Sequence, residues 1–170
     1  MVMLHFLKRT LEVLFLHKYS GSTDLSTAGL IGFVYAFHTV MICGTSNPNP
    51  LDSSVTVGSL LFIIGTVGNF YHHYLLACLR GGDAGRGLAK QYVAPRGGLF
   101  EFVAAPHYLF ELIGWLGIAI VSEQATAYLI FAGMVSYLSA RSKNQNTWNK
   151  QKFSDKDWPS TRKNLIPFLY

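Results

Sequence analysis

The chain is poor in charged side chains. Only 14% of its 170 residues are Asp, Glu, Lys or Arg, whereas half are hydrophobic and 14% are aromatic. Ordinary soluble domains carry about a quarter charged residues. The mean hydropathy is positive, at +0.26. An ordinary soluble domain is therefore disfavoured, and a disordered chain is excluded because there is ample apolar surface for a folded core.

The chain also has few cysteines and no recognisable nucleotide-binding loop motif. Cys43 and Cys78 are the two cysteines, and both lie in apolar surroundings outside any CxxC pair. This spacing supports neither a disulfide scaffold nor a zinc module. The glycine-rich stretch 81–87 fits neither a Walker A loop nor GxGxxG, and no βαβ pattern surrounds it, so a dinucleotide-binding sheet is excluded.

Long stretches of the chain contain almost no charge. Asp52 is the one charged residue between Asp24 and Arg80, and Glu123 is the one between Glu111 and Arg141. A helix needs about 20 apolar residues to cross a bilayer. We predict four spans, over residues 27–44, 55–79, 99–121 and 125–140. The predicted fold is all-α, a multi-span transmembrane bundle of four to five membrane helices.

The basic residues test this arrangement, because cytoplasmic connections are rich in Lys and Arg. The connections 45–54 and 122–124 have none, whereas four lie between the second and third spans and seven in the tail after residue 140. If the spans alternate in direction, the basic connections share one face, which we expect to be cytoplasmic. The net charge of +5 is thus explained without nucleic acid, for which the chain shows no recognised module.

The first segment, residues 2–17, differs from the predicted spans. Its polar residues follow a helical spacing of i, i+3, i+4 and i+7, at His5, Lys8, Arg9 and Glu12. This stripe has to face a cavity, protein or water. Lys8 and Arg9 also interrupt any signal-peptide core. We expect the chain to begin partway through a helical bundle.

Two further groups of polar residues fall on predicted spans. Asn69, His73 and Arg80 share one face of the second span, and His107 and Glu111 are one turn apart on the third, just after Pro106. Polar groups in a membrane are costly and are functional candidates. The alternatives are hydrogen bonds between helices with Arg80 reaching the interface, and a structural pair between Glu111 and His107.

The loop between these spans offers cations and glycines. Arg80, Arg86, Lys90 and Arg96 are suited to phosphate, and Gly97 and Gly98 would let backbone approach a ligand closely. Histidines form the other candidate set, for haem or metal, but their spacing matches no known signature and no metal site is predicted. These histidines are His38, His72, His73 and His107.

At these residues the sequence resembles the steroid 5α-reductase family, together with the related trans-2-enoyl-CoA reductases and polyprenol reductases. The matching motifs follow one another in order over nearly the whole chain. They are HFLKRT at 5–10, LFLHKYSG at 14–21, GNFYHHYLL at 68–76, PRGGLF at 95–100, PHYLFE at 106–111 and RKNLIPF at 162–168. The first motif is most similar to the enoyl-CoA reductases, and the later ones to the steroid-reductase branch.

The resemblance implies an integral enzyme of the endoplasmic reticulum membrane. Such an enzyme transfers hydride from NADPH to a carbon conjugated to a carbonyl, in a lipid that enters between helices. For this chain the favoured substrate is a 3-oxo-Δ4 steroid, and a very-long-chain enoyl-CoA is the alternative. The NADPH positions implied, in a cleft open to the cytoplasm, are Asn69, His73, Arg80, Tyr92, His107, Glu111 and Arg141.

The sequence departs from the family pattern in three places. Residues 1–170 match the family's C-terminal membrane domain, without the helices that precede it. At the position where part of the family has a catalytic Tyr, this chain has Phe6. Where the family's tail normally has an element like His/Arg-Trp-Tyr, this chain has QNTWN at 145–149. By position, His5 is the candidate proton donor, with a core histidine as the alternative. A shortened, non-catalytic membrane paralogue is the alternative function.

Overall fold

The computed structural model describes residues 1–17, 24–79 and 92–170, and these residues are helical apart from connections and tail. The elements are α1 (Val2–Leu11), the π-helix η1 (Glu12–Leu16), α2 (Leu25–Thr45), α3 (Asp52–Leu79), the 3-10 turn η2 (Gly98–Glu101), α4 (Pro106–Ser122) and α5 (Ala125–Lys152). Within these ranges extended pairing is limited to a single bridge between Val103 and Lys163. The all-α prediction is confirmed.

The helix boundaries match some of the predicted spans and differ from others. The first two predicted spans coincide with α2 and α3 to within a few residues. The third predicted span begins at Leu99, but α4 begins later, at Pro106, where the sequence predicts a helix start or kink and where the missing N–H of proline costs nothing. The fourth helix does not end at Ala140 but continues to Lys152, because its polar half is also rich in helix-forming residues.

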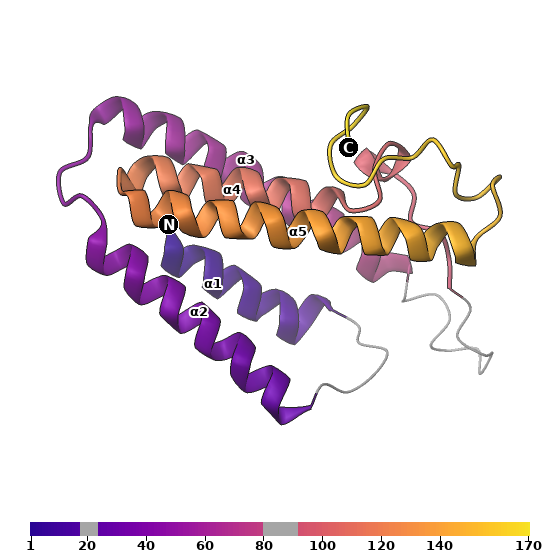
Figure 1. Ribbon diagram of the computed structural model, residues 1–170, viewed down its shortest axis with the longest axis horizontal. Coiled ribbons are helices and arrows are strands. Elements are labelled where there is room, and N and C mark those ends of the chain that lie inside the picture. The colour runs from indigo at the N-terminus through magenta and orange to yellow at the C-terminus, as the bar shows by residue number, and fades with distance from the viewer. Residues whose placement is uncertain (18–23, 80–91) are drawn as a thin grey trace.

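The centre of the fold is the close contact between α3 and α4. Figure 1 shows α3, α4 and α5 running side by side along the longest axis, with α1 beneath them. Gly65 faces Gly114 so closely that a Cβ on Gly65 would lie 2.6 Å from the Gly114 Cα. Likewise, a Cβ on Gly58 would lie 2.6 Å from the Gly117 carbonyl oxygen. Small residues thus let the two backbones touch.

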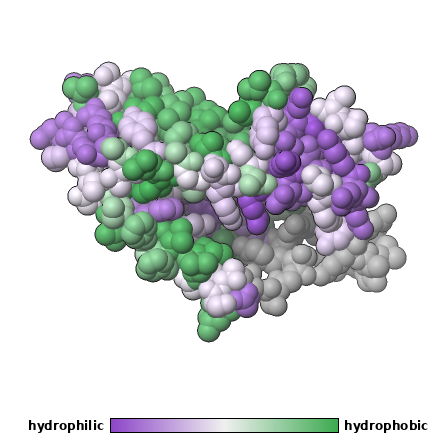
Figure 2. All heavy atoms as spheres, viewed as in Figure 1, coloured by the Kyte–Doolittle hydropathy of each residue, from purple (hydrophilic) through white to green (hydrophobic). Residues whose placement is uncertain are grey.

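Helix α2 packs quite differently. Asp24 caps its start by accepting a hydrogen bond from the Thr27 N–H at 2.8 Å. Ile42 is its one buried residue, and in Figure 1 the helix diverges from the bundle towards its N-terminal end. Large apolar side chains, such as Phe33 and Val40, are 67% and 68% exposed. Figure 2 shows several hydrophobic areas on this side of the molecule, separated by residues of intermediate hydropathy.

Two of the described helices, α2 and α3, are long and apolar enough to cross a membrane. Helix α4 is apolar but shorter, with 17 residues. In α5 the apolar first half is followed by a polar second half, so the helix as a whole lacks the composition of a span. The structure therefore supports two of the predicted spans by length and composition.

The tail after α5 folds back against the start of α4. The Ala104 N–H donates to the Lys163 carbonyl oxygen at 2.8 Å, and the Lys163 N–H to that of Phe102 at 2.9 Å. Trp158 is buried and its indole N–H donates to Asn146 Oδ1 of α5 at 2.9 Å. The tail thereby fixes the segment 95–105, which leads into α4.

Candidate functional site

A group of polar side chains lies where α1, η1, α3 and α4 meet, and we call it the polar cluster. Its members are Lys8, Glu12, Asn69, His73 and Glu111. Lys8 and Glu12 come from the polar stripe of the first segment, Asn69 and His73 from α3, and Glu111 from α4. The structure therefore brings together four of the seven positions implied to hold NADPH, because His107 also lies here, with its carbonyl oxygen hydrogen-bonded to Asn69 and its ring beside that of His73.

Asn69 is the residue that joins the three helices. Its side chain is buried, and its Oδ1 accepts a hydrogen bond from the Lys8 ammonium of α1. Its Nδ2 donates to the backbone carbonyl of His107 at 2.8 Å and lies 3.5 Å from Glu111 Oε2. Because Asn69 lies one turn after Gly65, the close α3–α4 approach brings its amide within reach of α4.

Glu12 organises the other side of the polar cluster. Its side chain is only 2% exposed, and its carboxylate lies 2.8 Å from Lys8 Nζ and 3.4 Å from Arg9 Nη1. His73 Nδ1 of α3 is 3.2 Å from Glu12 Oε2. A buried carboxylate with two cations is well compensated. Of the three surroundings predicted for the polar stripe, a cavity, protein or water, the structure shows protein at Glu12.

Three histidine rings follow one another beside this carboxylate. The ring of His73 lies 4.9 Å from that of His17 and 5.2 Å from that of His107, measured between centroids. Glu12, His17 and His73 present possible ligand atoms within 4.8 Å of one another. Lys8 and Arg9 already neutralise the carboxylate, which opposes a further cation, so the group serves better as a charge network than as a metal site.

His107 and Trp115 each hold a buried polar atom without a partner. Among the described residues, neither His107 Nδ1 nor Trp115 Nε1 has a hydrogen bond. Buried polar atoms of this kind are rare and call for an explanation such as a ligand. Glu111 does not pair with His107 on its own helix; the partner that the structure gives it is Asn69.

His5 lies on α1 apart from the hydrogen bonds of the polar cluster. It is buried, and its ring packs edge-on against Trp115 at 4.9 Å and Phe6 at 5.2 Å. The Phe6 ring continues to Tyr35 of α2 at 5.0 Å. His5 therefore sits in an aromatic group between α1, α2 and α4, one helical turn before Lys8.

His72 has a structural use that sequence reasoning did not assign. Its Nδ1 lies 2.7 Å from the Gly68 carbonyl oxygen, and its Nε2 accepts from the Leu99 N–H at 3.1 Å. Gly98 has φ +54°, and a Cβ there would lie 2.8 Å from the His72 ring. The glycines of the 95–100 motif thus let backbone approach His72, which fixes η2 against α3.

The remaining predicted positions lie elsewhere or outside the described residues. Tyr92 packs on Trp148 of α5, with a centroid distance of 5.2 Å, and Lys152 lies over its ring. Arg141 is exposed and hydrogen-bonds to the side chain of Tyr108 at the start of α4. Arg80, Arg86 and Lys90 lie in the range 80–91, outside the described residues.

Sequence reasoning missed the way the tail holds the 95–101 segment. Arg162 Nη2 lies 3.5 Å from Glu101 Oε2, and Nη1 donates to the Pro95 carbonyl at 3.4 Å. Its guanidinium stacks on Trp158 at 4.0 Å. Burial lowers the pKa of Arg162 below its ordinary value, and Glu101 opposes that effect. The RKNLIPF motif marked this residue, but no periodicity pointed to its partners.

Known proteins match this chain over most of its length. A family profile described as 3-oxo-5-alpha-steroid 4-dehydrogenase matches residues 24–170. A very-long-chain enoyl-CoA reductase of Dictyostelium discoideum is 32% identical over 98% of the chain and 55% of the relative. A 3-oxo-5-alpha-steroid 4-dehydrogenase 1 of Rattus norvegicus is 30% identical over 99% of the chain and 65% of the relative.

A plant relative extends the range of similar proteins. The steroid 5-alpha-reductase DET2 of Gossypium hirsutum is 35% identical over 66% of the chain and 42% of its own length. The chain thus spans between half and two thirds of the first two relatives, and less of this one. These relatives confirm the resemblance read from the motifs, including its two branches.

Proposed function

Because the chain belongs to the 3-oxo-5-alpha-steroid 4-dehydrogenase family, we propose that it serves NADPH-dependent reduction of a C=C bond conjugated to a carbonyl in a lipid. The relatives named as reductases of steroids and of enoyl-CoA support this reaction class. The observation that carries the proposal is Asn69, buried and hydrogen-bonded to residues of two other helices. A polar group held in this way between apolar helices is a functional candidate.

The polar cluster fits one part of a nicotinamide cofactor. Asn69 and Glu111 offer amide and carboxylate groups to ribose or amide groups, and the unpartnered His107 Nδ1 offers a further site. Arg80 and Arg141 would bind the cofactor's phosphates, and Tyr92 would contribute to the site from the loop between α3 and α4. When bound, NADPH supplies the hydride; the chain's residues orient it and exclude water.

His5 is the proposed proton donor near the substrate carbonyl. Negative charge develops on that oxygen during reduction, so a donor placed there lowers the barrier. Its burial beside Trp115 and Phe6 gives it an apolar, aromatic surrounding that suits a lipid. The neighbouring Lys8 and Glu12 hold the same helix face against α3.

We also propose that the chain is an integral membrane protein of the endoplasmic reticulum, with its cofactor site facing the cytoplasm. Nearly all of the apolar surface of α2 is exposed, which water would penalise and lipid would not. The connections 45–54 and 122–124 contain no Lys or Arg, whereas the stretch 80–96 contains four and the tail after residue 140 contains seven, so the basic stretches share one face if the spans alternate in direction. Carbonate extraction and protease protection of microsomes test this placement: release of the chain, or a protected tail, contradicts it.

The substrate we favour is a 3-oxo-Δ4 steroid. Its rings would be buried among apolar helix faces, at about 25 cal/mol per Å² of apolar surface. A very-long-chain enoyl-CoA is the second candidate, because the Dictyostelium relative named for that activity matches 98% of the chain. An enoyl-CoA would in addition place its phosphates against the basic cytoplasmic loop.

NADPH oxidation by the chain in nanodiscs tests the function. The assay compares a 3-oxo-Δ4 steroid, a long trans-2-enoyl-CoA and a polyprenol. We expect turnover with the steroid and a loss of turnover in Asn69→Ala, while Lys143→Ala, on the exposed part of α5, serves as the matched control. Turnover of the enoyl-CoA alone would favour the second candidate. NADPH binding without turnover of any lipid would select the non-catalytic alternative.

A further inference from the structure

The last residues of the chain form a closed turn with an apolar outer surface. We call residues 165–170 the C-terminal turn. The N–H groups of Leu165 and Ile166 both donate to the Tyr170 main-chain oxygen, at 2.7 and 2.9 Å. Leu165 is buried, whereas Phe168 and Leu169 are 80% and 76% exposed. The turn is therefore anchored at Leu165 and presents Phe168 and Leu169 outward.

The backbone of this turn is strained at Phe168. Its φ is +65°, a left-handed conformation that a bulky residue rarely adopts. Such conformations persist where the surroundings impose them, often at functional sites. Here the conformation keeps the Phe168 ring on the outside of the turn, 5.5 Å from that of Phe102, which is itself 44% exposed.

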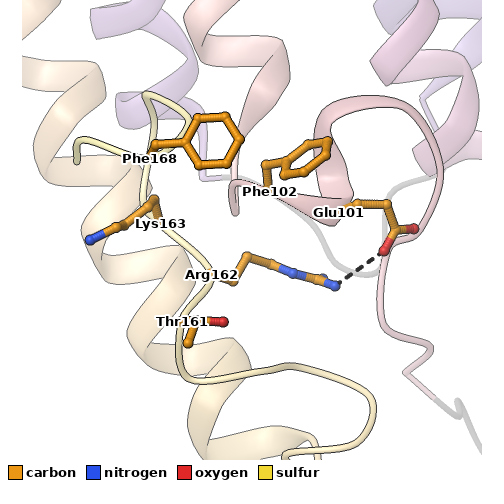
Figure 3. A pocket seen from close by; sticks show the side chains of 6 residues that line it. All are labelled: Glu101, Phe102, Thr161, Arg162, Lys163 and Phe168. Carbon is orange, nitrogen blue, oxygen red and sulfur yellow. Dashed lines mark ion pairs between the residues drawn. The ribbon is translucent and has the colours of Figure 1, made fainter.

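The two phenylalanines form the wall of a pocket whose floor is polar. The pocket has a volume of about 280 Å³ and is lined by Glu101, Phe102, Thr161, Arg162, Lys163 and Phe168. Figure 3 shows Phe102 and Phe168 side by side, with the Glu101–Arg162 ion pair below them. Lys163 is exposed, and its amino group points away from that pair. Among the described residues no carboxylate pairs with Lys163, so its charge suits an outside anion.

The position of the turn along α5 matches the edge of a bilayer. The Tyr170 hydroxyl lies 3.4 Å from the Ser139 carbonyl oxygen, next to the point where α5 changes from apolar to basic at Arg141. Figure 2 shows a hydrophobic patch at the end of the tail, next to the hydrophilic surface of the polar half of α5. Aromatic residues and Lys are the side chains that membrane interfaces favour.

We propose that the C-terminal turn is a membrane-interface anchor for anionic phospholipid. Phe168 and Leu169 enter the boundary between headgroups and acyl chains, Phe102 lies beside them, and Lys163 meets the lipid phosphate. Because residues 163 and 164 hydrogen-bond to the segment before α4, the anchor also sets the depth at which α4 begins. This inference rests on the membrane placement proposed above and not on the reductase activity.

Depth-dependent fluorescence quenching tests the anchor. The full chain, carrying Cys43→Ser and Cys78→Ser, receives one new cysteine at Leu169→Cys, labelled with an environment-sensitive dye, in nanodiscs that contain phosphatidylserine. We expect a blue-shifted emission and strong quenching by lipids with a spin label near the headgroup. Ser160→Cys, on the exposed polar tail, is the matched control and should stay unquenched.

Two further variants make the outcomes decisive. Phe33→Cys, near the middle of α2, reports the membrane placement itself when the lipids carry the spin label deep in the acyl chain. Quenching by the deep label at residue 33 without quenching by the headgroup label at residue 169 overturns the anchor alone, and no quenching at either position overturns both proposals. Lys163→Gln should lower the ratio of inserted to exposed label about fivefold, the effect of one lysine at an anionic surface, whereas Lys156→Gln should have less effect. Equal insertion in nanodiscs of neutral lipid would contradict the role of Lys163.

Discussion

Helices α2 and α3 are both apolar, long and rich in glycine, yet their glycines have opposite surroundings. On α3, a Cβ at Gly58 or Gly65 would overlap the backbone of α4, whereas on α2 no atom lies within 4 Å of a Cβ at Gly29 or Gly32. Similar compositions thus give a closely packed helix and an outlying one. The difference lies in the partner helix, because Gly114 and Gly117 of α4 provide the matching surface.

The polar residues follow the same division. Asn69 and His73 lie on α3, at the level where the first segment also contacts this helix. Helix α2 contacts the neighbouring helices through the rings of Tyr35 and His38 and through a hydrogen bond between Tyr35 and Arg9. Close backbone approach therefore coincides with the polar cluster. We infer that the α3–α4 contact holds the site and that α2 mainly faces lipid.

The largest expected effect comes from filling the close contact. Gly65→Leu would force α3 and α4 apart, and we expect the free energy of unfolding in mixed micelles to fall by about 3 kcal/mol, the upper range for overpacking. Gly32→Leu, the matched change on α2, should leave it nearly unchanged. Equal losses in both variants would mean that α2 is as closely packed in the protein as α3.

Removing the buried carboxylate should have the next largest effect. Glu12→Gln removes the negative charge that pairs with Lys8 and Arg9. We expect the free energy of unfolding to fall by about 2 kcal/mol, the scale of a hydrogen bond to a charged group. Asp52→Asn, at the exposed start of α3, is the control. If the free energy of unfolding does not change in Glu12→Gln, the polar stripe of the first segment does not stabilise the packing of α1 against α3.

A third prediction concerns the tail after α5, which we expect to position the segment before α4 from outside the α3–α4 contact. Arg162→Lys keeps the charge but loses the planar contact with Trp158 and the reach to both Glu101 and Pro95. We expect a loss of about 1 kcal/mol in stability, together with faster proteolysis near residue 96. Arg96→Lys, whose pair with Asp157 is exposed, should behave like the unchanged chain.

The smallest effect concerns the connection at the far ends of α2 and α4. Hydrogen bonds from Ser54, Asn47 and the Leu51 N–H lower the pKa of Glu123 below its ordinary value of 4.5. Its contribution to stability is therefore present above pH 4.5 and is lost as the pH falls through the lowered pKa. Unfolding of the unchanged chain and of Glu123→Gln should differ at neutral pH and converge in acid. A constant difference would exclude this carboxylate as the cause.

The sequence predicted the helices well because charge-free stretches and glycine–proline punctuation are local signals. It placed α2 and α3 almost correctly and marked Pro106 as a helix start or kink, but it began the third span at Leu99, because hydropathy does not distinguish the apolar residues of η2 and the following segment from those of a helix. It also ended the fourth at Ala140, because hydropathy marks where apolar residues stop and not where a helix does.

The candidate site was predictable only in part. Helical spacing placed Asn69 with His73, and it placed His5, Lys8 and Glu12 on one stripe, but it gave no sign that Glu12 would meet His73 across two helices. Tyr92 was expected beside the cofactor, and the structure places it on Trp148 and Lys152. Contacts between elements depend on how the helices pack. Here the packing depends on Gly65 of α3 fitting against Gly114 of α4, and this fit cannot be seen in the sequence of either helix alone.

A fluorescence titration with NADPH tests most directly whether the α3–α4 contact builds the cofactor site. The measurement compares the unchanged chain with Gly65→Ala, Gly32→Ala and Asn69→Ala in nanodiscs, with circular dichroism to confirm that each remains helical. We predict NADPH binding that is unchanged in Gly32→Ala and at least about tenfold weaker in Gly65→Ala and Asn69→Ala, a loss within the range for an unsatisfied buried polar group. Equal affinity in all four proteins, or none in the unchanged chain, would contradict the account.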